Sequence, residues 1–540
     1  MLKSGATGRF HMDKLGNAPT RRELLTAIGM IGGTAALYQA MTTMAHAAET
    51  QFAGPPNLSG ARRGASVVIL GAGLAGMLAA YELAKAGYKV RILEYQNRAG
   101  GRNWSLYGGD TYTELGGATQ KVRFAPGNYL NPGPWRIPHH HRTLLHYCKS
   151  FGVKLEPFIQ FNHNAYVHND AFGGKPQRFK ALAADFEGNV AELLNKAIDQ
   201  KALDTALTAE DRDRLKEALR DWGMLDKDMR YAKNLRSSEH RGFDRPPGGG
   251  VNGAPIPSEP FAFKDVLDSR IWTQMAFFMN YEFQTTMFQP VGGMGMIGKA
   301  FAQQVQPLLT FNAKVTKLMQ DRKGVTVSYT DTATGEAKTE RADYCVCTIP
   351  LGILNQIESN LSDPMKAAVS AVPYSNSVKI GLEMGRRFWE EDQAIYGGHS
   401  FTNQEISLIS YPNFDYLKDG PAVLLGAFAS GMGAYRLGGM TPEERIEAAL
   451  SQGSVFHPQQ YRKEYRNGAS VAWSRVPWTM GCCARWNEDT RKAHYQTLVG
   501  VDDRVVLAGE HASYVGCWME GALLSSLDAI TRLHKRALEA

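Results

Sequence analysis

Ser66 to Arg102 reads SVVILGAGLAGMLAAYELAKAGYKVRILEYQNRAGGR, and this stretch decides the fold of the chain. Its apolar start predicts a buried strand of a parallel sheet, its glycines a tight turn, and the residues after them a helix. A second predicted strand ends at Glu94. A strand, a glycine turn, a helix, a strand and an acid in this order are typical of an α/β unit that binds a dinucleotide.

Each glycine of the first turn has its own physical task. Gly71 permits the tight turn, Gly73 lets the backbone approach a pyrophosphate, and Gly76 lets the helix pack closely on the strand. The helix begins with Leu74 and Ala75, so unpaired N–H groups and the positive end of the helix dipole face the phosphates. We therefore predict that these five residues hold the pyrophosphate.

The residues after the second strand indicate which dinucleotide binds. Glu94 stands where an acidic side chain takes the ribose hydroxyls. Arg98-Ala-Gly-Gly101-Arg102 is a second glycine turn flanked by guanidinium groups, which suits a pyrophosphate held from the other side. This pattern resembles that of the flavin-dependent amine oxidases, and a nicotinamide dehydrogenase does not need it. The expected cofactor is FAD.

Length and composition set broad limits on the protein. The chain has 540 residues, which is enough for two or three domains. Its hydrophobic content of 44% and charged content of 21% are ordinary for a globular protein. A net charge of +7 is mild for this length and gives no reason to expect nucleic-acid binding.

Residues 1–47 are predicted to be a removable twin-arginine signal peptide. Arg21 and Arg22 precede a Gly-rich, moderately apolar stretch at 25–41, and Ala45-His46-Ala47 is a small-x-small cleavage site. The apolar stretch is marginal in length for a membrane span, and a disordered or anchoring tail is the alternative. We expect a periplasmic or secreted protein, exported already folded and without a stable membrane anchor.

The six cysteines and a run of three histidines are not expected to bind a metal. The cysteines form no CxxC pair, so buried free thiols are expected rather than a disulfide framework. His139, His140 and His141 follow a proline and have no carboxylate or cysteine at ligand spacing, so they predict a helix start rather than a metal site.

Two C-terminal motifs extend the resemblance over most of the mature chain. Leu507-Ala-Gly-Glu510 and Cys517-Trp-Met-Glu-Gly-Ala522 resemble the closing FAD signature of bacterial flavin-dependent L-amino acid oxidases, within the flavin monoamine oxidase family. The resemblance implies that Trp518 walls the substrate's amino group. It also implies FAD contacts by Glu510, Met519, Trp473, Trp135 and the backbone near Val315.

The same resemblance implies the fold class. We expect an α/β, Rossmann-type flavoprotein with the two-dinucleotide-binding-domain architecture of the amine oxidases and an α+β substrate domain. The expected domains are a discontinuous FAD domain at 61–103, 288–372 and 500–540, a substrate-binding sheet domain at 104–178 and 373–499, and a helical domain at 179–287 with a Pro/Gly-rich loop at 245–260.

Two residues are expected beside the flavin ring. Lys379 matches the family lysine that holds a water near flavin N5, where positive charge favours the reduced ring; an exposed strand lysine is the alternative. Cys482 stands where mitochondrial monoamine oxidases carry a covalently flavinylated cysteine. Because the amino acid oxidases hold FAD noncovalently, noncovalent binding is expected here.

A carboxylate clamp distinguishes amino acid oxidases from simple amine oxidases. Gly133-Pro-Trp-Arg136-Ile-Pro resembles the turn whose arginine binds the substrate carboxylate, for which the planar guanidinium fork is suited. Tyr411 matches the tyrosine that gives this carboxylate a second hydrogen bond. An insertion at 119–132 leaves the register open, and Arg123 is the competing clamp.

The resemblance implies an oxidase that transfers a hydride from Cα of an L-amino acid to flavin N5. The products would be a 2-oxo acid, ammonium and hydrogen peroxide, with apolar or aromatic side chains favoured. The alternatives are an amine or polyamine oxidase, an amide-forming L-amino acid monooxygenase, and a non-catalytic flavin-binding protein. The expected partners are a small-molecule substrate and dioxygen, and the sequence leaves a homodimer open.

Overall fold

The computed structural model describes residues 52–60, 64–203 and 206–539, so the predicted signal peptide lies outside the described residues. The chain divides into two units, 1–53 and 54–540, and the second holds every element below. Within the described part of the chain, no helix combines the length and the apolar character that crossing a membrane requires.

A six-stranded sheet is built around the predicted dinucleotide unit. Its strand order is β14 (Leu309–Thr310), β2 (Lys89–Leu93), β1 (Ser66–Leu70), β18 (Tyr344–Cys347), β28 (Val505–Leu507) and β27 (Val501–Asp502). All neighbours pair in parallel except β27 with β28. β18 is buried along its whole length, as expected for a parallel strand covered on both faces.

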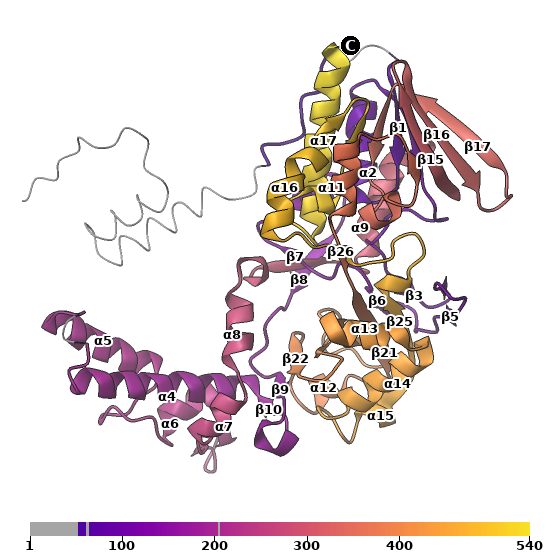
Figure 1. Cartoon of the computed structure of the whole chain (residues 1–540). Helices are drawn as coiled ribbons and strands as arrows, with labels where there is room; N and C mark the ends of the chain where they lie inside the picture. The colour runs from indigo at the N-terminus through magenta and orange to yellow at the C-terminus, as the bar shows by residue number, and fades with distance from the viewer. Residues whose placement is uncertain (1–51, 61–63, 204–205, 540) are drawn as a thin grey trace, which may run out of the picture. The chain divides into compact units, whose positions relative to one another are not determined.

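Three helices far apart in sequence pack together beside this sheet. α2 (Leu74–Lys85) contacts both α9 (Gly295–Val305) and α17 (Met519–Glu539), and Figure 1 shows α2 next to β1. A second sheet contacts strands of the six-stranded sheet, and its order is β17 (Ala337–Ala342), β16 (Gly324–Asp331), β15 (Ala313–Asp321) and β19 (Glu358–Ser359). α10 (Leu351–Leu354), α11 (Asp363–Ser370) and α16 (Glu488–Leu498) complete this part of the molecule.

A seven-stranded sheet forms the core of the other large part. Its order is β10 (Gln177–Arg178), β9 (Tyr166–His168), β22 (His399–Thr402), β23 (Leu408–Ser410), β24 (Ala422–Ser430), β21 (Ser377–Met384) and β25 (Tyr465–Ala472). Every residue of β21 is buried, because the sheet lies between other elements rather than at the surface. α12 (Phe388–Glu391), α13 (Gly431–Gly439), α14 (Pro442–Gly453) and α15 (Tyr461–Glu464) belong to this part (Figure 1).

Residues 179–283 are mainly helical. The helices are α4 (Phe179–Asp199), α5 (Ala209–Trp222), α6 (Leu235–Arg241), α7 (Phe263–Asp268), α8 (Trp272–Met279) and the short η2 (Tyr281–Phe283). Thr208 caps α5 by accepting a hydrogen bond from the N–H of Asp211. The Pro/Gly-rich segment is not all loop, since β11 (Phe243–Arg245) pairs with β12 (Ile256–Pro257).

A small sheet positions the candidate site. β13 (Met287–Pro290) pairs antiparallel with β7 (Ile137–Pro138) on one side and with β8 (Leu155–Phe158) on the other. Since β7 follows Arg136 directly and β13 begins shortly after η2, this pairing brings the end of the helical segment to Arg136. α3 (Arg142–Ser150) begins just after β7.

Three short two-stranded ladders complete the described structure. They are β3 (Leu106–Tyr107) with β6 (Tyr129–Leu130), β4 (Thr111–Thr113) with β5 (Thr119–Lys121), and β20 (Tyr374–Ser375) with β26 (Cys483–Ala484). The insertion at 119–132 therefore contributes strands to two of these ladders.

Candidate active site

The first glycine turn has the geometry of a phosphate cradle. Gly71 has φ +104°, and a Cβ on Gly76 would lie 2.0 Å from the carbonyl oxygen of Gly71, so only glycine fits there. By contrast, a Cβ on Gly73 would meet nothing within 4 Å. The N-terminus of α2, which starts at Leu74 and Ala75, has no side-chain cap, and its first N–H groups stay open to an anion.

Glu94 ties the end of β2 to this cradle. Its Oε2 accepts the N–H of Ala72 across 2.6 Å, and its Oε1 accepts the N–H of Gln96 across 2.8 Å. Burial raises the pKa of Glu94, while these two N–H groups act in the opposite direction. The strand containing Val315 begins beside it, because the N–H of Ala313 donates to the carbonyl oxygen of Glu94.

The second glycine turn lies against the first. The N–H of Gly100 donates to the carbonyl oxygen of Ala72 across 2.8 Å, and a Cβ on Gly101 would lie 3.3 Å from Cα of Gly73. The two glycine turns are therefore in direct backbone contact. The residues present fit a dinucleotide pyrophosphate, since they offer backbone N–H groups and no acidic side chain at the start of α2.

Arg102, which is partly exposed, and the buried Glu510 form an ion pair next to the two turns. Arg102 Nη1 lies 2.8 Å from Glu510 Oε1 and 2.7 Å from the carbonyl oxygen of Cys482. Burial raises the pKa of Glu510, but Arg102, His511 and the N–H of Ala484 together lower it below its usual value. Met519 lies close by, with its Sδ 3.0 Å from Asn103 Nδ2 at the start of α17.

One expectation about the cysteines was wrong. Cys483 and Cys517 form a disulfide with their Cα atoms 5.1 Å apart, and the other four cysteines are free. The two residues are separated by 34 positions, so only the folded turn before α17 brings them within bonding distance. The disulfide joins the segment after Cys482 to the residue that precedes Trp518.

Arg136 is a buried cation surrounded by aromatic rings. It is 8% exposed, and its Cζ lies 4.7 Å from the ring centre of Phe283, 5.0 Å from Trp135 and 5.7 Å from Trp518. It makes no hydrogen bond or ion pair with another residue of 52–60, 64–203 and 206–539, and its Nε is fully buried. Burial lowers the pKa of Arg136 to about 9, so the group stays mostly charged at neutral pH. The competing residue, Arg123, is exposed.

Lys379 is buried beside the same turn rather than exposed on a strand. Its Nζ donates to the carbonyl oxygen of Gly133 across 2.6 Å and lies 4.6 Å from the ring centre of Phe428 and 5.0 Å from that of Trp135. Burial, and then the charge of Arg136, lowers the pKa of Lys379 to about 7.

Trp473 packs under this turn. Its ring N–H donates to the carbonyl oxygen of Pro132 across 2.7 Å, and the side chain is almost fully buried. Trp473 therefore supports the segment that leads to Trp135 and Arg136. Its contact with a flavin stays a prediction.

Tyr411 is not brought against Arg136. It shares a cavity of about 50 Å³ with Trp135, but its hydroxyl lies 2.8 Å from Ser400 Oγ and 2.9 Å from His457 Nε2. These partners belong to the core of the seven-stranded sheet. Carboxylate binding by Tyr411 stays a prediction.

The sequence did not point to two further residues near Arg136. Phe283 covers the guanidinium from η2, and His399 lies 4.7 Å from Trp135 between ring centres, with its Nδ1 3.0 Å from Ser410 Oγ. Burial, and then the charge of Arg136, lowers the pKa of His399 to about 3, so this imidazole is neutral. Neither residue belongs to a local motif, and no sequence signal could have found them.

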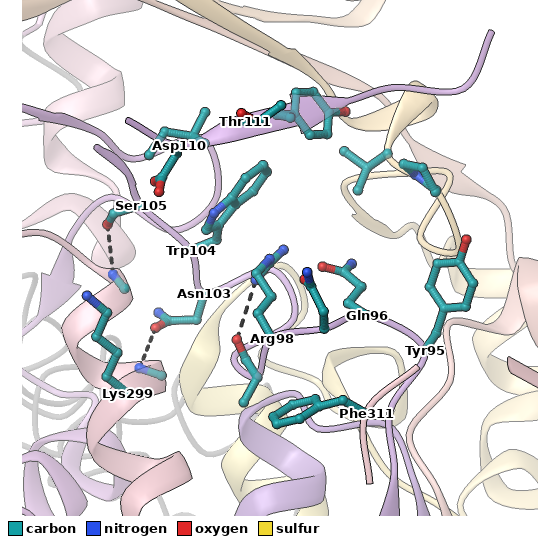
Figure 2. A pocket seen from close by; sticks show the side chains of 18 of the residues that line it. Tyr95, Gln96, Arg98, Asn103, Trp104, Ser105, Asp110, Thr111, Lys299 and Phe311 are labelled. Carbon is teal, nitrogen blue, oxygen red and sulfur yellow. Dashed lines mark hydrogen bonds between the residues drawn. The ribbon is translucent and has the colours of Figure 1, made fainter. Parts of the chain in front are cut away.

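A larger cavity, of about 670 Å³, lies on the outer side of the second glycine turn. Figure 2 shows Arg98 and Lys299 there, with Asn103 and Ser105 accepting hydrogen bonds from backbone N–H groups of α9. The Arg98 guanidinium lies 4.4 Å from the ring centre of Trp104. None of the first-turn glycines lines this cavity, but Arg98 and Ala99 of the second turn do.

The two glycine turns, the acid at the end of β2 and the ion pair of Arg102 with Glu510 define an α/β dinucleotide-binding protein. The profile of the family described as flavin containing amine oxidoreductase matches residues 74–533. The chain belongs to this family, is an oxidoreductase of the flavin amine oxidase fold, and uses a flavin cofactor; the predicted fold class is confirmed.

Similar proteins fall into two groups by name. A Bacillus subtilis (strain 168) protein with the provisional name L-amino-acid oxidase YobN is 25% identical over 87% of this chain and 95% of its own length. An L-amino-acid oxidase of Siganus canaliculatus is 27% identical over 87% of this chain and 86% of its own. The solved structure of cyclohexylamine oxidase from Brevibacterium oxydans IH-35A has a TM-score of 0.57 at 18% identity, covering 87% of this chain and 99% of that one.

Proposed function

We propose that this protein is an FAD-dependent L-amino acid oxidase. The observation that carries the proposal is Arg136, a buried guanidinium without an acidic partner among the described residues. An unpaired charge in a protein interior is costly, so such a group needs a counter-ion from outside the chain. A substrate carboxylate supplies that charge, and the planar fork of arginine binds it through two parallel hydrogen bonds.

The surroundings of Arg136 suit the rest of an amino acid. The rings of Trp518 and Phe283 lie next to the guanidinium of Arg136. They favour a substrate with an apolar or aromatic side chain, and they can also flank its amino group. A carboxylate fixed at Arg136, an amino group at Trp518 and a side chain against the rings together orient Cα. Three separate contacts of this kind distinguish L from D substrates.

The cofactor we propose is FAD, held without a covalent bond. Bound FAD would supply the redox chemistry, as acceptor of a hydride from Cα and as donor of electrons to dioxygen. The chain's own residues bind and orient: the two glycine turns with Glu94 hold the dinucleotide, and Lys379 places a titratable amine beside the turn of Arg136. Cys482 offers a thiol in this region, and the carbonyl oxygen of its backbone accepts from Arg102.

We also propose export through the twin-arginine route to the periplasm or beyond. The Arg21-Arg22 motif supports it, and so does the Cys483–Cys517 disulfide, because disulfides persist mainly in oxidising compartments. A folded-state route would let the protein take up its cofactor before export.

The deciding experiment is anaerobic mixing of the holoprotein with L-amino acids, D-amino acids and primary amines, followed by flavin absorbance. We expect rapid bleaching by apolar or aromatic L-amino acids and slow or no bleaching by their D-isomers and decarboxylated amines. Faster bleaching of the flavin by amines would instead favour an amine oxidase. An amide product found after aerobic turnover would indicate a monooxygenase. If no compound bleaches the flavin, the protein is a non-catalytic flavin-binding protein.

A further inference from the structure

Two histidines and one carboxylate converge next to the candidate site. His140 Nε2 lies 3.2 Å and His141 Nε2 lies 3.0 Å from the same oxygen, Oε2 of Glu282. All three ligand atoms lie within 4.8 Å of one another. The imidazoles are buried, and the Glu282 side chain is 27% exposed. The sequence predicted a helix start and no metal site at these histidines, because the carboxylate that meets them, Glu282, is 141 residues from His141 along the chain.

We propose that His140, His141 and Glu282 bind a zinc ion. Neutral imidazole nitrogens and a carboxylate oxygen are the ligands that zinc takes in sites with three protein ligands and one open position. Tetrahedral zinc with bonds of about 2.0–2.1 Å separates its ligand atoms by about 3.3 Å. The two N–O distances are close to that separation, so small side-chain movements would admit the ion.

The backbone around the ligands is held firmly. Both carboxylate oxygens of Glu520 accept backbone N–H groups in the first turn of α3, from Thr143 across 3.0 Å and from Leu144 across 2.8 Å. This negative charge also offsets the positive helix end, which would otherwise repel a cation. His141 packs its ring 5.0 Å from that of Trp518, so its orientation is restricted.

The partial exposure of Glu282 gives the ion a route to the site. An ion bound there would join η2, which carries Glu282, to the start of α3. The next residue after Glu282 is Phe283, whose ring covers Arg136. Zinc binding would therefore fix the aromatic cover of the guanidinium without touching the substrate.

Without a metal, the same atoms can form two ordinary hydrogen bonds. Each Nε2–H would donate to Oε2 of Glu282, which has two lone pairs. Zinc binding must displace both protons, so the two states differ in metal content and in how the imidazoles are bonded.

Zinc itself is the probe that tests the proposal. Untagged holoprotein is dialysed against a chelator and then titrated with Zn²⁺ in competition with a chromophoric chelator. We expect about one zinc per chain in the wild type, and binding weakened by well over tenfold in Glu282→Gln and His141→Ala. His139→Ala is the matched control, because His139 is an exposed neighbour outside the cluster, and it should bind like the wild type.

Equal zinc binding by the wild type and Glu282→Gln would overturn the proposal, and so would absence of binding in the wild type. If a variant fails to fold, zinc-edge X-ray absorption on the wild type decides the matter. We expect scattering from two imidazoles at about 2.0 Å. A spectrum without imidazole, or with sulfur ligands, would place the zinc elsewhere and contradict the site.

Discussion

The ammonium group of Lys379 donates a hydrogen bond to the carbonyl oxygen of Gly133 across 2.6 Å, in the turn that carries Arg136. Strand β21, which carries Lys379, thus contacts the turn that carries Arg136. The side chains of Lys379 and Arg136 are both buried and lie close together. Burial is the main cause that lowers the pKa of Lys379, and the charge of Arg136 lowers it further. A negatively charged substrate group bound at Arg136 would relieve their repulsion.

Arg136→Ala should lose turnover of L-amino acids while keeping its flavin. Removing one partner of a buried charge pair costs on the order of 2–5 kcal/mol, which is roughly a thirty- to several-thousand-fold loss in kcat/KM. Activity on the matching decarboxylated amine should fall much less, and Arg136→Lys should recover little because lysine lacks the fork. Near-normal kcat/KM for L-amino acids in Arg136→Ala would shift the clamp elsewhere, with Arg123→Ala as the next variant.

Lys379 should make stability depend on pH. Its pKa is about 7 in the folded protein and ordinarily 10.5, so the unfolded chain binds more protons between these values. The contribution of Lys379 to the free energy of unfolding therefore rises as the pH increases from about 7 towards 10.5, and it is constant below pH 7. The melting temperature of the wild type relative to Lys379→Met should increase from pH 7 to pH 9.5. A difference that stays flat over this range would argue against the lowered pKa.

Two glycines of the first turn should fail in different ways. A Cβ at position 73 meets no other protein atom within 4 Å, so Gly73→Val should fold. Its side chain would, however, block the close approach of the pyrophosphate to the backbone of this turn. Gly76→Ala would place a Cβ 2.0 Å from a carbonyl oxygen and should yield little soluble protein. Circular dichroism and bound-flavin absorbance separate the two results. A flavin-loaded Gly73→Val would contradict the assigned cradle.

The thiol count should report both the disulfide and the flavin linkage. Denatured, unreduced protein should titrate four thiols, from Cys148, Cys345, Cys347 and Cys482, and six after reduction. Three thiols, with flavin retained in the acid precipitate, would mean a covalent bond to Cys482. Six thiols before reduction would mean that the disulfide is absent. Closing a loop of 34 positions is worth on the order of 3–4 kcal/mol, so Cys483→Ser should also melt earlier.

Export should depend on the paired arginines of the leader. Replacing Arg21 and Arg22 together by lysine should leave a flavin-loaded, active precursor in the cytoplasm, because the twin-arginine route requires both residues. Cell fractionation with activity staining measures this, and replacing Lys14, outside the motif, by arginine serves as the control. Unchanged export of the double variant would show that residues 1–47 have another role.

Much of the cofactor site could be predicted because its determinants are local. Gly71, Gly73, Gly76 and Glu94 lie within one strand–helix–strand unit, where each residue type answers a steric or electrostatic need of that unit. Lys379 and Arg136 were identified only through the resemblance to flavin-dependent amine oxidases. A lysine in a strand, or an arginine between two prolines, does not by itself indicate a function. Their burial came from the structure.

The sequence by itself determined the dinucleotide unit and the α/β class, because glycine turns and hydrophobic periodicity act over a few residues. Only the tertiary structure decided that Cys483 bonds to Cys517, that Phe283 covers Arg136, and that Glu282 meets His140 and His141. These contacts join segments that are far apart in the chain. They depend on how β13 pairs with β7 and how the turn before α17 closes, and no local pattern encodes either arrangement.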